Sequence, residues 1–283
     1  MAKSEGLLYV VATPIGNLGD ITLRALEVLK QADLIAAEDT RLTGHLLKHF
    51  GISAKLLSVR EHNEETGALK LIDAMREGRS VALVTDAGTP AVSDPGARVV
   101  AAVRAAGFAV VPIPGANAAV AALSVSGLNA PHFLFYGFLP AKTGERRSAL
   151  EALKALPYAL VFYEAPHRIA ETIDDLLTIL GGEREIVFGR ELTKTFEQIQ
   201  VCPLREASAW LSADANRQRG EFVLIVSGAT EDTSAGDGER VLKILLRELP
   251  ASQAAKLAAQ ISGEKKNALY ELALQLKKES GSA

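Results

Sequence analysis

A chain of 283 residues is long enough for two domains with a sizeable core. Hydrophobic residues make up 48% of it, yet no uncharged apolar run is long enough to cross a bilayer, so no membrane-spanning segment is expected. The net charge of −3 gives no general attraction for nucleic acid, so a nucleic-acid partner would need local positive charge.

Cysteine and histidine give no support for a metal site. The single cysteine, Cys202, excludes an internal disulfide and a multi-cysteine site, and we expect it to be buried in a protein of the reducing cytoplasm. His45 and His49 have the spacing of neighbours on one helix face, but they lack the glutamate of a zinc-protease motif and an obvious third ligand. We interpret them as a surface pair and expect no bound metal.

Apolar runs alternate with helical patterns along the first part of the chain. The predicted strands cover residues 7–12, 33–37, 55–59, 80–84 and 109–112. The predicted helices lie near residues 21–31, 43–50, 65–77, 97–106 and 116–125. This alternation is typical of a parallel sheet with right-handed crossovers, so we expect an N-terminal α/β domain over residues 1–118.

A second series of strands follows. Its predicted strands cover residues 132–136, 158–163, 185–192, 197–201 and 221–226. Its predicted helices lie near residues 145–156, 168–180 and 204–211. The last three strands are close together in sequence, which favours antiparallel neighbours and a mixed sheet. We therefore expect a second α/β domain over residues 119–228.

The composition of residues 229–238 is typical of a flexible linker. Beyond it, helical patterns near residues 239–249, 252–261 and 265–277 predict a helix-turn-helix-like module over residues 239–283, with Ser252 as an N-cap. Between Ser252 and Lys278 there are five lysines and two glutamates, so Lys265 and Lys266 could meet phosphates. The alternative is a solvated helical cap on the core.

The loop over residues 85–96 follows an apolar strand and contains mostly small residues. Asp86 stands at the strand end, and small neighbours such as Gly88 let a ligand approach the backbone closely. We expect Asp94 to cap the next helix and Pro95 to be its first residue. The loop has neither a Walker A nor a G-x-G-x-x-G pattern, which gives nucleotide phosphates no support. Taken alone, it fits a tight turn equally well.

Other strand ends have similar features. The loops over residues 11–20 and 112–118 also contain small residues, and three such loops at one sheet edge favour a shared ligand site. Polar side chains follow the strands at residues 37–41 and 57–65, where Arg41, Arg60, His62 and Asn63 could surround the crevice mouth, and residues 162–168 and 190–194 end two later strands in a similar way. The alternative is a set of solvated helix starts. No motif supports nucleophilic catalysis.

Several of these motifs together resemble the tetrapyrrole-methylase superfamily. The resemblance rests on residues 16–26, the Asp86 loop, residues 114–117 and residues 220–223. It implies S-adenosylmethionine-dependent methyltransferases with two α/β domains, a cofactor in the interdomain cleft and a homodimeric assembly.

Within that superfamily the chain is most similar to the branch that methylates small-subunit ribosomal RNA. The matching stretches are residues 12–20, 37–41, 61–64, 85–96, 137–140, 162–168, 189–194 and 265–270. The tetrapyrrole branch has Gly-x-Gly-Pro-Gly-Asp where this chain has residues 13–20, and Gly-Asp-Pro where it has Asp86-Ala87-Gly88. These differences argue against a corrin or sirohaem precursor as the substrate.

The resemblance implies in-line transfer of a methyl group to the ribose 2′-hydroxyl of a cytidine in the decoding region. Such a reaction needs alignment and removal of the hydroxyl proton, with or without a dedicated base. The candidate catalytic residues are Glu164, His62, Arg190 and Lys194. The predicted cofactor contacts are Pro14, Asp86, Ala87, Gly88, Thr89, Gly115, Asn117, Ala118 and Tyr163. The predicted RNA contacts are Arg41, Arg60, Asn63, Arg168, Lys265 and Lys266.

The expected partner is small-subunit ribosomal RNA, either free or in the assembled subunit. Two alternatives stay open. One is a methyltransferase of the same superfamily that acts on a tetrapyrrole or a protein side chain. The other is a noncatalytic RNA-binding module that uses the basic tail, which would bind no cofactor.

Overall fold

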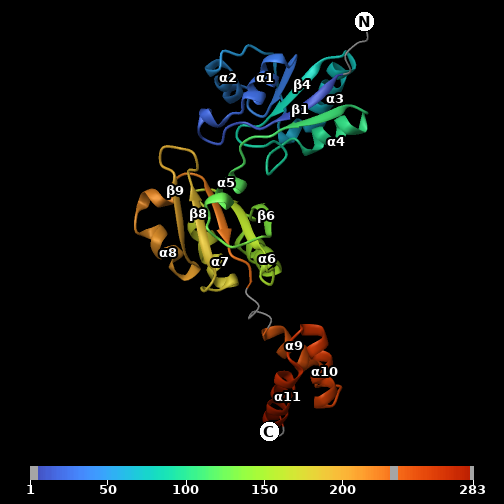
Figure 1. The fold of residues 1–283 in the computed structure, drawn as a ribbon, viewed down its shortest axis with the longest axis vertical. Helices are drawn as coiled ribbons and strands as arrows, with labels where there is room; N and C mark the ends of the chain where they lie inside the picture. Colours follow the sequence, from blue (N-terminus) through green and yellow to red (C-terminus); the bar gives the residue numbers. More distant parts are fainter. Residues whose placement is uncertain (1–5, 230–234, 281–283) are drawn as a thin grey trace.

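The computed structural model describes residues 6–229 and 235–280. Figure 1 shows two α/β bodies and a smaller helical body that follow one another along the chain. None of the helices in these residues is long and apolar enough to cross a membrane.

The first sheet has five parallel strands in the order β3-β2-β4-β1-β5. The strands are β1 (Leu7–Val11), β2 (Leu34–Ala37), β3 (Leu56–Ser58), β4 (Ser80–Val84) and β5 (Ala109–Ile113). Helices α1 (Leu23–Gln31) and α2 (Thr40–His49) share one apolar core with the sheet, and α3 (Glu64–Arg76) and α4 (Ala97–Ala105) share another. The predicted parallel α/β arrangement is confirmed, with helices on both faces.

The second sheet is mixed, as predicted, in the order β6-β7-β10-β8-β9. Its strands are β6 (Phe133–Phe138), β7 (Ala159–Glu164), β8 (Glu185–Arg190), β9 (Gln198–Pro203) and β10 (Phe222–Val226). Only β6 and β7 pair in parallel; β7, β10, β8 and β9 pair antiparallel. The short connection between β8 and β9 accounts for their antiparallel pairing, whereas β10 inserts between β7 and β8 although it follows β9 in the chain.

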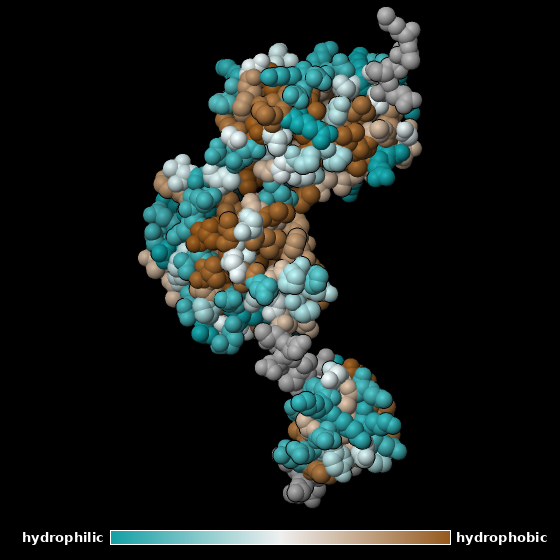
Figure 2. All heavy atoms as spheres, viewed as in Figure 1, coloured by the Kyte–Doolittle hydropathy of each residue, from teal (hydrophilic) through white to brown (hydrophobic). Residues whose placement is uncertain are grey.

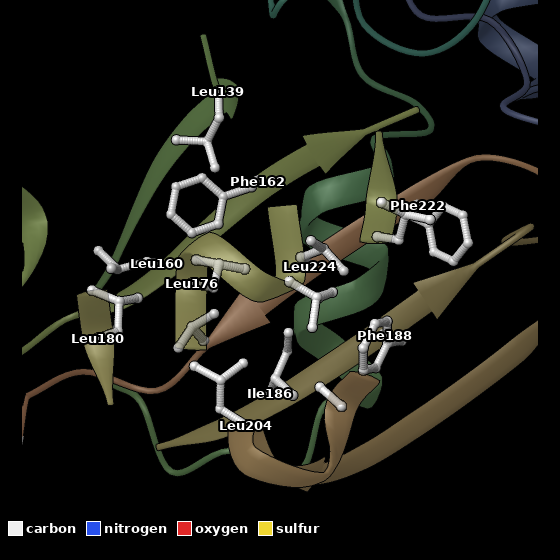
Figure 3. Close-up of a cluster of buried hydrophobic side chains, with 14 of the residues drawn as sticks. Leu139, Leu160, Phe162, Leu176, Leu180, Ile186, Phe188, Leu204, Phe222 and Leu224 are labelled. Carbon is white, nitrogen blue, oxygen red and sulfur yellow. The ribbon is translucent and has the colours of Figure 1, made fainter. Parts of the chain in front are cut away.

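Helices cover both faces of the second sheet. One face packs against α6 (Thr143–Leu153), α7 (Ile169–Leu180) and α8 (Leu204–Ser212), and Figure 3 shows part of that core around Phe162, Leu176 and Leu224. The other face packs against α5 (Ala118–Val125), whose Ala119 and Ala122 contribute to a separate apolar cluster. The chain thus passes from the first sheet to the second immediately before α5, while the domain boundary at residue 118 stays a prediction.

The C-terminal helices are α9 (Ala235–Leu245), α10 (Ala251–Ser262) and α11 (Lys266–Ser280), and they have an apolar core of their own. Helix α9 begins inside the segment predicted as a linker, whose residues 230–234 lie outside the described residues. The N-cap of α10 is Pro250 and not Ser252, because the Pro250 carbonyl already accepts from Ala254 N at 2.9 Å. Gly263 adopts the left-handed conformation that ends α10.

The start of α4 corrects a second capping prediction. The helix begins at Ala97 with Gly96 as its N-cap, so Asp94 and Pro95 belong to the preceding loop. Ala91 and Ser93 have positive φ values of 65° and 64°, and Ala91 N donates to Pro95 O at 3.3 Å, which closes the loop before the helix starts. The helix is capped from outside, because Gly96 N donates to the Glu64 carboxylate of α3.

Candidate active site

A cavity of about 310 Å³ lies between the carboxyl ends of the first sheet and the second domain, a volume within the range of roughly 300–1,000 Å³ for small-molecule sites. Loops after β1, β4 and β5 contribute one wall, and β6, β7, β8, β10 and their loops contribute the other. The lining residues from the first wall are Ile15, Ala87, Gly88, Thr89, Val92, Asp94, Asn117 and Ala118. Those from the second include Phe138, Tyr163, Glu164, Gly189, Leu192, Lys194 and Glu221.

Hydrogen bonds join the three strand-end loops of the first domain into one wall. Thr13 and Gly88 exchange backbone hydrogen bonds of 2.9 and 3.1 Å, which ties the β1 loop to the β4 loop. Thr89 Oγ1 donates to Ala116 O at 3.1 Å, which ties the β4 loop to the β5 loop. The predicted convergence of the three loops is therefore confirmed.

Two glycines in this wall have geometric reasons to be there. Gly88 has a φ of +80°, and a Cβ added to it would lie 3.4 Å from Ile15 Cγ2 at the cavity wall. A Cβ on Gly115 would lie only 2.8 Å from the Ala12 Cβ, so this glycine lets the β1 and β5 loops pack closely. Gly88 therefore forms part of the cavity surface, whereas Gly115 lets the loops that carry this surface pack together.

Six of the nine predicted cofactor contacts line the cavity: Ala87, Gly88, Thr89, Asn117, Ala118 and Tyr163. Pro14, Asp86 and Gly115 are not among the lining residues. Asn117 caps α5 by accepting from Val120 N at 3.1 Å. Tyr163 Oη accepts from Ala119 N at 3.3 Å, and the ring lies edge-on to Phe138 at 5.7 Å. Burial raises the pKa of Tyr163, so its hydroxyl stays protonated at neutral pH.

The two domains also touch at two glycines beside the cavity. A Cβ on Gly16 would lie 2.4 Å from Lys194 Cγ, so the β1 loop packs directly on the loop after β8. A Cβ on Gly137 would lie 2.7 Å from Ser93 Oγ, so a bulge in β6 packs against the loop that precedes α4. These contacts fix how closely the two walls approach.

A second, polar hollow of about 460 Å³ adjoins the cavity. It contains four of the predicted functional residues: Arg41, Arg60 and His62, which follow β2 and β3, and Asp86, a predicted cofactor contact that follows β4. The Arg41 side chain is 81% exposed, and Arg60 Nε donates to Glu38 O at 3.2 Å. The remaining lining residues are Glu38, Asp39, Glu61, Ser93, Asp94 and Pro95.

Five carboxylates line this hollow, and three of them, Glu38, Asp39 and Asp86, accept hydrogen bonds. Asp39 pairs with Arg41 at 2.7 Å, and the hydrogen bonds from Arg41 lower the pKa of Asp39. Asp86 Oδ1 accepts from Asp39 N at 2.9 Å, and Glu38 Oε2 accepts from Asp86 N at 3.4 Å. Burial and the Asp86 carboxylate raise the pKa of Glu38. For the other two, Glu61 and Asp94, the described part of the chain supplies no hydrogen-bond donor.

Burial, with Glu38 and Asp86 nearby, raises the pKa of Asp94 to about 6. Sequence reasoning missed this residue as a functional group, because it was interpreted as a helix cap. The glycine directly after Asp94-Pro95 was the available signal, since Gly96 is itself an acceptable N-cap and leaves the aspartate to a turn.

The contacts of Glu164 favour a structural role over the predicted catalytic one. Its side chain is buried, Oε2 accepts from Thr172 Oγ1 at 2.7 Å, and Oε1 accepts from Ala165 N at 2.8 Å. Arg168 Nε lies 3.3 Å from Oε1, and Arg168 Nη2 donates to Leu139 O at 2.6 Å. The pair therefore braces the ends of β6 and β7 against α7, and Arg168 is held there and not presented to RNA.

Arg190 and Lys194 are also held by neighbouring groups. Arg190 is buried and donates to Arg219 O at 2.7 Å and Phe196 O at 3.1 Å. Lys194 Nζ lies at the cavity wall and donates to Glu191 at 2.9 Å and Glu221 at 2.7 Å. These two carboxylates raise the pKa of Lys194, which keeps it charged and makes it a poor base.

The remaining predicted RNA contacts lie apart from one another. Asn63 is used locally: its Oδ1 accepts from Arg60 N at 2.7 Å. Lys265 and Lys266 are exposed at the start of α11, together with Lys256 of α10. Lys277 also falls within α11. The helical module thus presents basic side chains in a different body from the cavity.

Two family models match the sequence. Residues 7–208 match the model described as Tetrapyrrole (Corrin/Porphyrin) Methylases, and residues 232–277 match the one described as RsmI C-terminal HTH domain.

Curated relatives match over nearly the whole chain. The protein named Ribosomal RNA small subunit methyltransferase I from Escherichia coli O157:H7 is 53% identical over 275 residues, covering 96% of this chain and 96% of that protein. The protein of the same name from Pseudomonas aeruginosa is 50% identical over 276 residues, covering 96% and 98%.

Solved structures of more distant proteins have the same fold. Uroporphyrin-III-C-methyltransferase from Thermus thermophilus superposes with a TM-score of 0.56 at 24% identity, covering 79% of this chain and 94% of that chain. The methyltransferase CobJ gives a TM-score of 0.60 at 22% identity, covering 79% and 95%. At such identities the likeness supports the two-domain fold alone, which agrees with the predicted fold class.

Proposed function

The chain belongs to the family of ribosomal RNA small subunit methyltransferases I, within the tetrapyrrole methylases, and we propose that it methylates small-subunit ribosomal RNA with S-adenosylmethionine. The proposed acceptor is the ribose 2′-hydroxyl of a cytidine in the decoding region. The observation that carries this proposal is the junction of two hollows at Asp94, one largely apolar and one containing arginines. The first suits a small methyl donor, and at the second the exposed Arg41 and Arg60 offer an RNA phosphate local positive charge beside five carboxylates.

The groups around the cavity fit S-adenosylmethionine. Ile15, Phe138 and Leu192 offer apolar surface for the adenine ring, and the peptide groups of residues 87–89 can approach the donor because their side chains are small. When bound there, S-adenosylmethionine would supply a methyl group on a positively charged sulfur that is already a good leaving group. The protein then has to align the acceptor and remove one proton.

Arg41 and Arg60 would guide the RNA at the polar hollow. Both guanidinium groups lie at its wall, and the Arg41 side chain is largely open to solvent. Lys265 and Lys266 of the helical module would add phosphate contacts at a distance, which position RNA without reading its sequence. Substrate binding would thus use the two arginines at the hollow and a separate group of lysines on the helical module.

A transfer assay with labelled S-adenosylmethionine tests the substrate. Purified small ribosomal subunits, naked small-subunit RNA and a tetrapyrrole precursor are supplied in parallel, and the labelled RNA is digested to nucleosides for mass spectrometry. We expect 2′-O-methylcytidine from one of the two RNA substrates. A labelled tetrapyrrole, a methylated ribosomal protein or a methylated base would refute the proposed acceptor, and failure to bind S-adenosylmethionine would favour a noncatalytic RNA-binding module.

We also propose a homodimer that forms through the second α/β domain. Figure 2 shows apolar side chains gathered over this domain, and α5 and β6 expose Val120, Val125 and Phe133. Exposed apolar side chains on one domain are typical of an interaction site. Light scattering after size exclusion should give twice the chain mass, and Phe133→Glu should shift the protein toward the monomer. A wild-type monomer at all concentrations would refute the dimer.

A further inference from the structure

The loop over residues 191–197, which joins β8 to β9, forms part of the cavity wall and also exposes an aromatic ring. Leu192 and Lys194 line the cavity. Phe196, two residues farther along, is 71% exposed, more than any other phenylalanine, tyrosine or tryptophan in the described residues. Figure 1 shows the carboxyl end of β8, where this loop begins, on the side of the second domain that faces the first. A single exposed apolar side chain is ordinary, so the surroundings of Phe196 decide what it can do.

The loop that carries Phe196 is closed by its own contacts. Glu191 and Thr193 have positive φ values of 49° and 65°, which residues with a Cβ keep only when their surroundings enforce it. Glu197 Oε2 accepts from Thr193 N at 2.6 Å, and Glu197 N donates to Lys194 O at 3.1 Å. The exposed ring therefore projects from a defined loop and not from an extended free segment.

A buried arginine sets Phe196 beside an exposed one. Arg190 Nη1 donates to Phe196 O at 3.1 Å, and Arg190 Nε donates to Arg219 O at 2.7 Å. One guanidinium group thus bridges the two backbones. Arg219 is exposed, and no carboxylate in residues 6–229 and 235–280 pairs with its side chain. Phe196 and Arg219 are therefore neighbours that offer an apolar ring and an unpaired positive charge.

The acidic side chains of the same loops already have donors. Glu191 and Glu221 accept from Lys194 Nζ at 2.9 and 2.7 Å. Glu197 accepts from the backbone of the loop, as described above. The positive charge of Lys194 is balanced by its two partners, so Arg219 is the cation next to Phe196 that can bind an anion.

An aromatic face beside a cation is the combination that binds unpaired nucleotides. Every base has a π-face that can stack on an aromatic ring, and a neighbouring guanidinium group can bind the phosphate. A ribose that enters the cleft between the two domains has to leave the regular stack of its neighbours. A protein ring that stacks on a base at that point offsets part of the lost stacking.

We propose that Phe196 and Arg219 form a nucleotide-binding subsite. The Phe196 ring stacks on an unpaired base at or beside the acceptor nucleotide, and Arg219 binds a phosphate of the same strand. The proposal rests on the proposed RNA substrate. Arg190 is then a positioning residue, which accounts for its burial at a strand end. Arg41 and Arg60 belong to the first domain, so the RNA would be held from both sides of the cleft.

The first test compares Phe196→Leu and Phe196→Tyr with wild type in single-turnover transfer, with the RNA substrate that the transfer assay identifies. Because loss of one base–aromatic stack weakens binding by roughly 5- to 150-fold, we expect Phe196→Leu to raise the RNA concentration at half-maximal rate about tenfold. Phe196→Tyr keeps the ring and should behave as wild type. Tyr158→Leu removes an exposed ring at the opposite end of β7 from the cavity and is the matched control. S-adenosylmethionine affinity should stay unchanged in every variant.

Photochemical crosslinking reports the stack directly. RNA transcribed with 5-iodouridine or 5-iodocytidine, naked or reconstituted into subunits, crosslinks under near-ultraviolet light to an aromatic ring stacked against the iodinated base. Mass spectrometry should place a crosslink on Phe196 in the wild type, and Phe196→Leu should lose it. A crosslink pattern without Phe196 would overturn the stacking.

The salt dependence of RNA binding tests Arg219. If its guanidinium group binds one phosphate, Arg219→Ala should weaken RNA binding and lower the slope of log affinity against log salt by about 0.7. Arg205→Ala is the matched control, because Arg205 is exposed but pairs with Glu183 at 2.6 Å. An equal slope in Arg219→Ala and wild type would remove Arg219 from the subsite.

The outcomes separate the subsite from the proposed function. If the wild type produces 2′-O-methylcytidine but Phe196→Leu reaches half-maximal rate at the wild-type RNA concentration, the subsite is wrong and the proposed function stands. A shift of Phe196→Leu toward the monomer in light scattering would make the ring a contact between two copies of the chain and would also overturn the subsite. If the wild type methylates no RNA, the proposed function itself fails.

Discussion

Replacing Asp94 with Asn should stabilise the protein at neutral pH. The pKa of this carboxyl group is about 6 in the folded protein, against 3.8 for an ordinary aspartate in water. Between these values the folded state binds more protons than the unfolded state, so the free energy of unfolding falls as pH rises from about 4 to 6. The difference corresponds to about 3 kcal/mol at most, and because the group is only half-buried we expect about 1 kcal/mol above pH 7.

Urea unfolding of the full chain, followed by circular dichroism at about pH 4 and pH 7.5, measures this effect. The variant and the wild type should be equally stable at the lower pH, and the variant should be more stable at the higher one. Asp33→Asn is a control of opposite sign, because hydrogen bonds from Ser80 lower the pKa of Asp33. Equal stabilities of Asp94→Asn and wild type at pH 7.5 would refute the reasoning.

Three further variants test other parts of the molecule. Gly88→Val strains a φ of +80° at the cavity wall and should weaken S-adenosylmethionine binding at least about tenfold by calorimetry, with the fold retained in circular dichroism. The double variant Lys265→Glu, Lys266→Glu should weaken RNA binding and reduce its salt dependence without changing cofactor affinity. If RNA affinity depended on salt as strongly in the variant as in the wild type, the helical module would be only a structural cap. Glu164→Gln should lower the free energy of unfolding by about 1–3 kcal/mol, because it weakens the buried contact with Arg168. The pH dependence of the methyl-transfer rate should stay unchanged. A rate that no longer depended on pH in this variant would identify Glu164 as the base.

The fold followed largely from the sequence because local patterns determine it. The apolar run of β4 is buried on both faces, as a central parallel strand requires, and the close spacing of β8, β9 and β10 indicated antiparallel pairing. Side-chain caps such as Thr22 and Asn117 lie where the helices begin. The helix ends differ from the prediction, as at the starts of α4 and α10, where the N-cap is a glycine or a proline and not the predicted aspartate or serine.

The site was harder to predict because distant residues determine it. Glu64 caps a helix 32 positions away, which frees Asp94, and no local pattern around Asp94 reports this. Glu164 and Arg190 stand at strand ends, as catalytic groups often do, but partners elsewhere in the chain bury them. A strand-end position therefore predicted which residues lie near the cleft and not which of them are free to react.

Gly16 and Gly137 together limit how closely the two α/β domains can approach each other. At both points the two α/β domains meet through steric contact, while the hydrogen bonds of the cavity walls, such as Thr13 with Gly88 and Lys194 with Glu191, run within one domain. Ile15 of the first domain also packs against the apolar cluster of the second, so separation of the domains around the single chain crossing before α5 would cost this apolar contact but none of those hydrogen bonds. Binding of the methyl donor and release of the demethylated thioether would then depend on how far the two α/β domains separate. A larger side chain at either glycine would hold the domains apart.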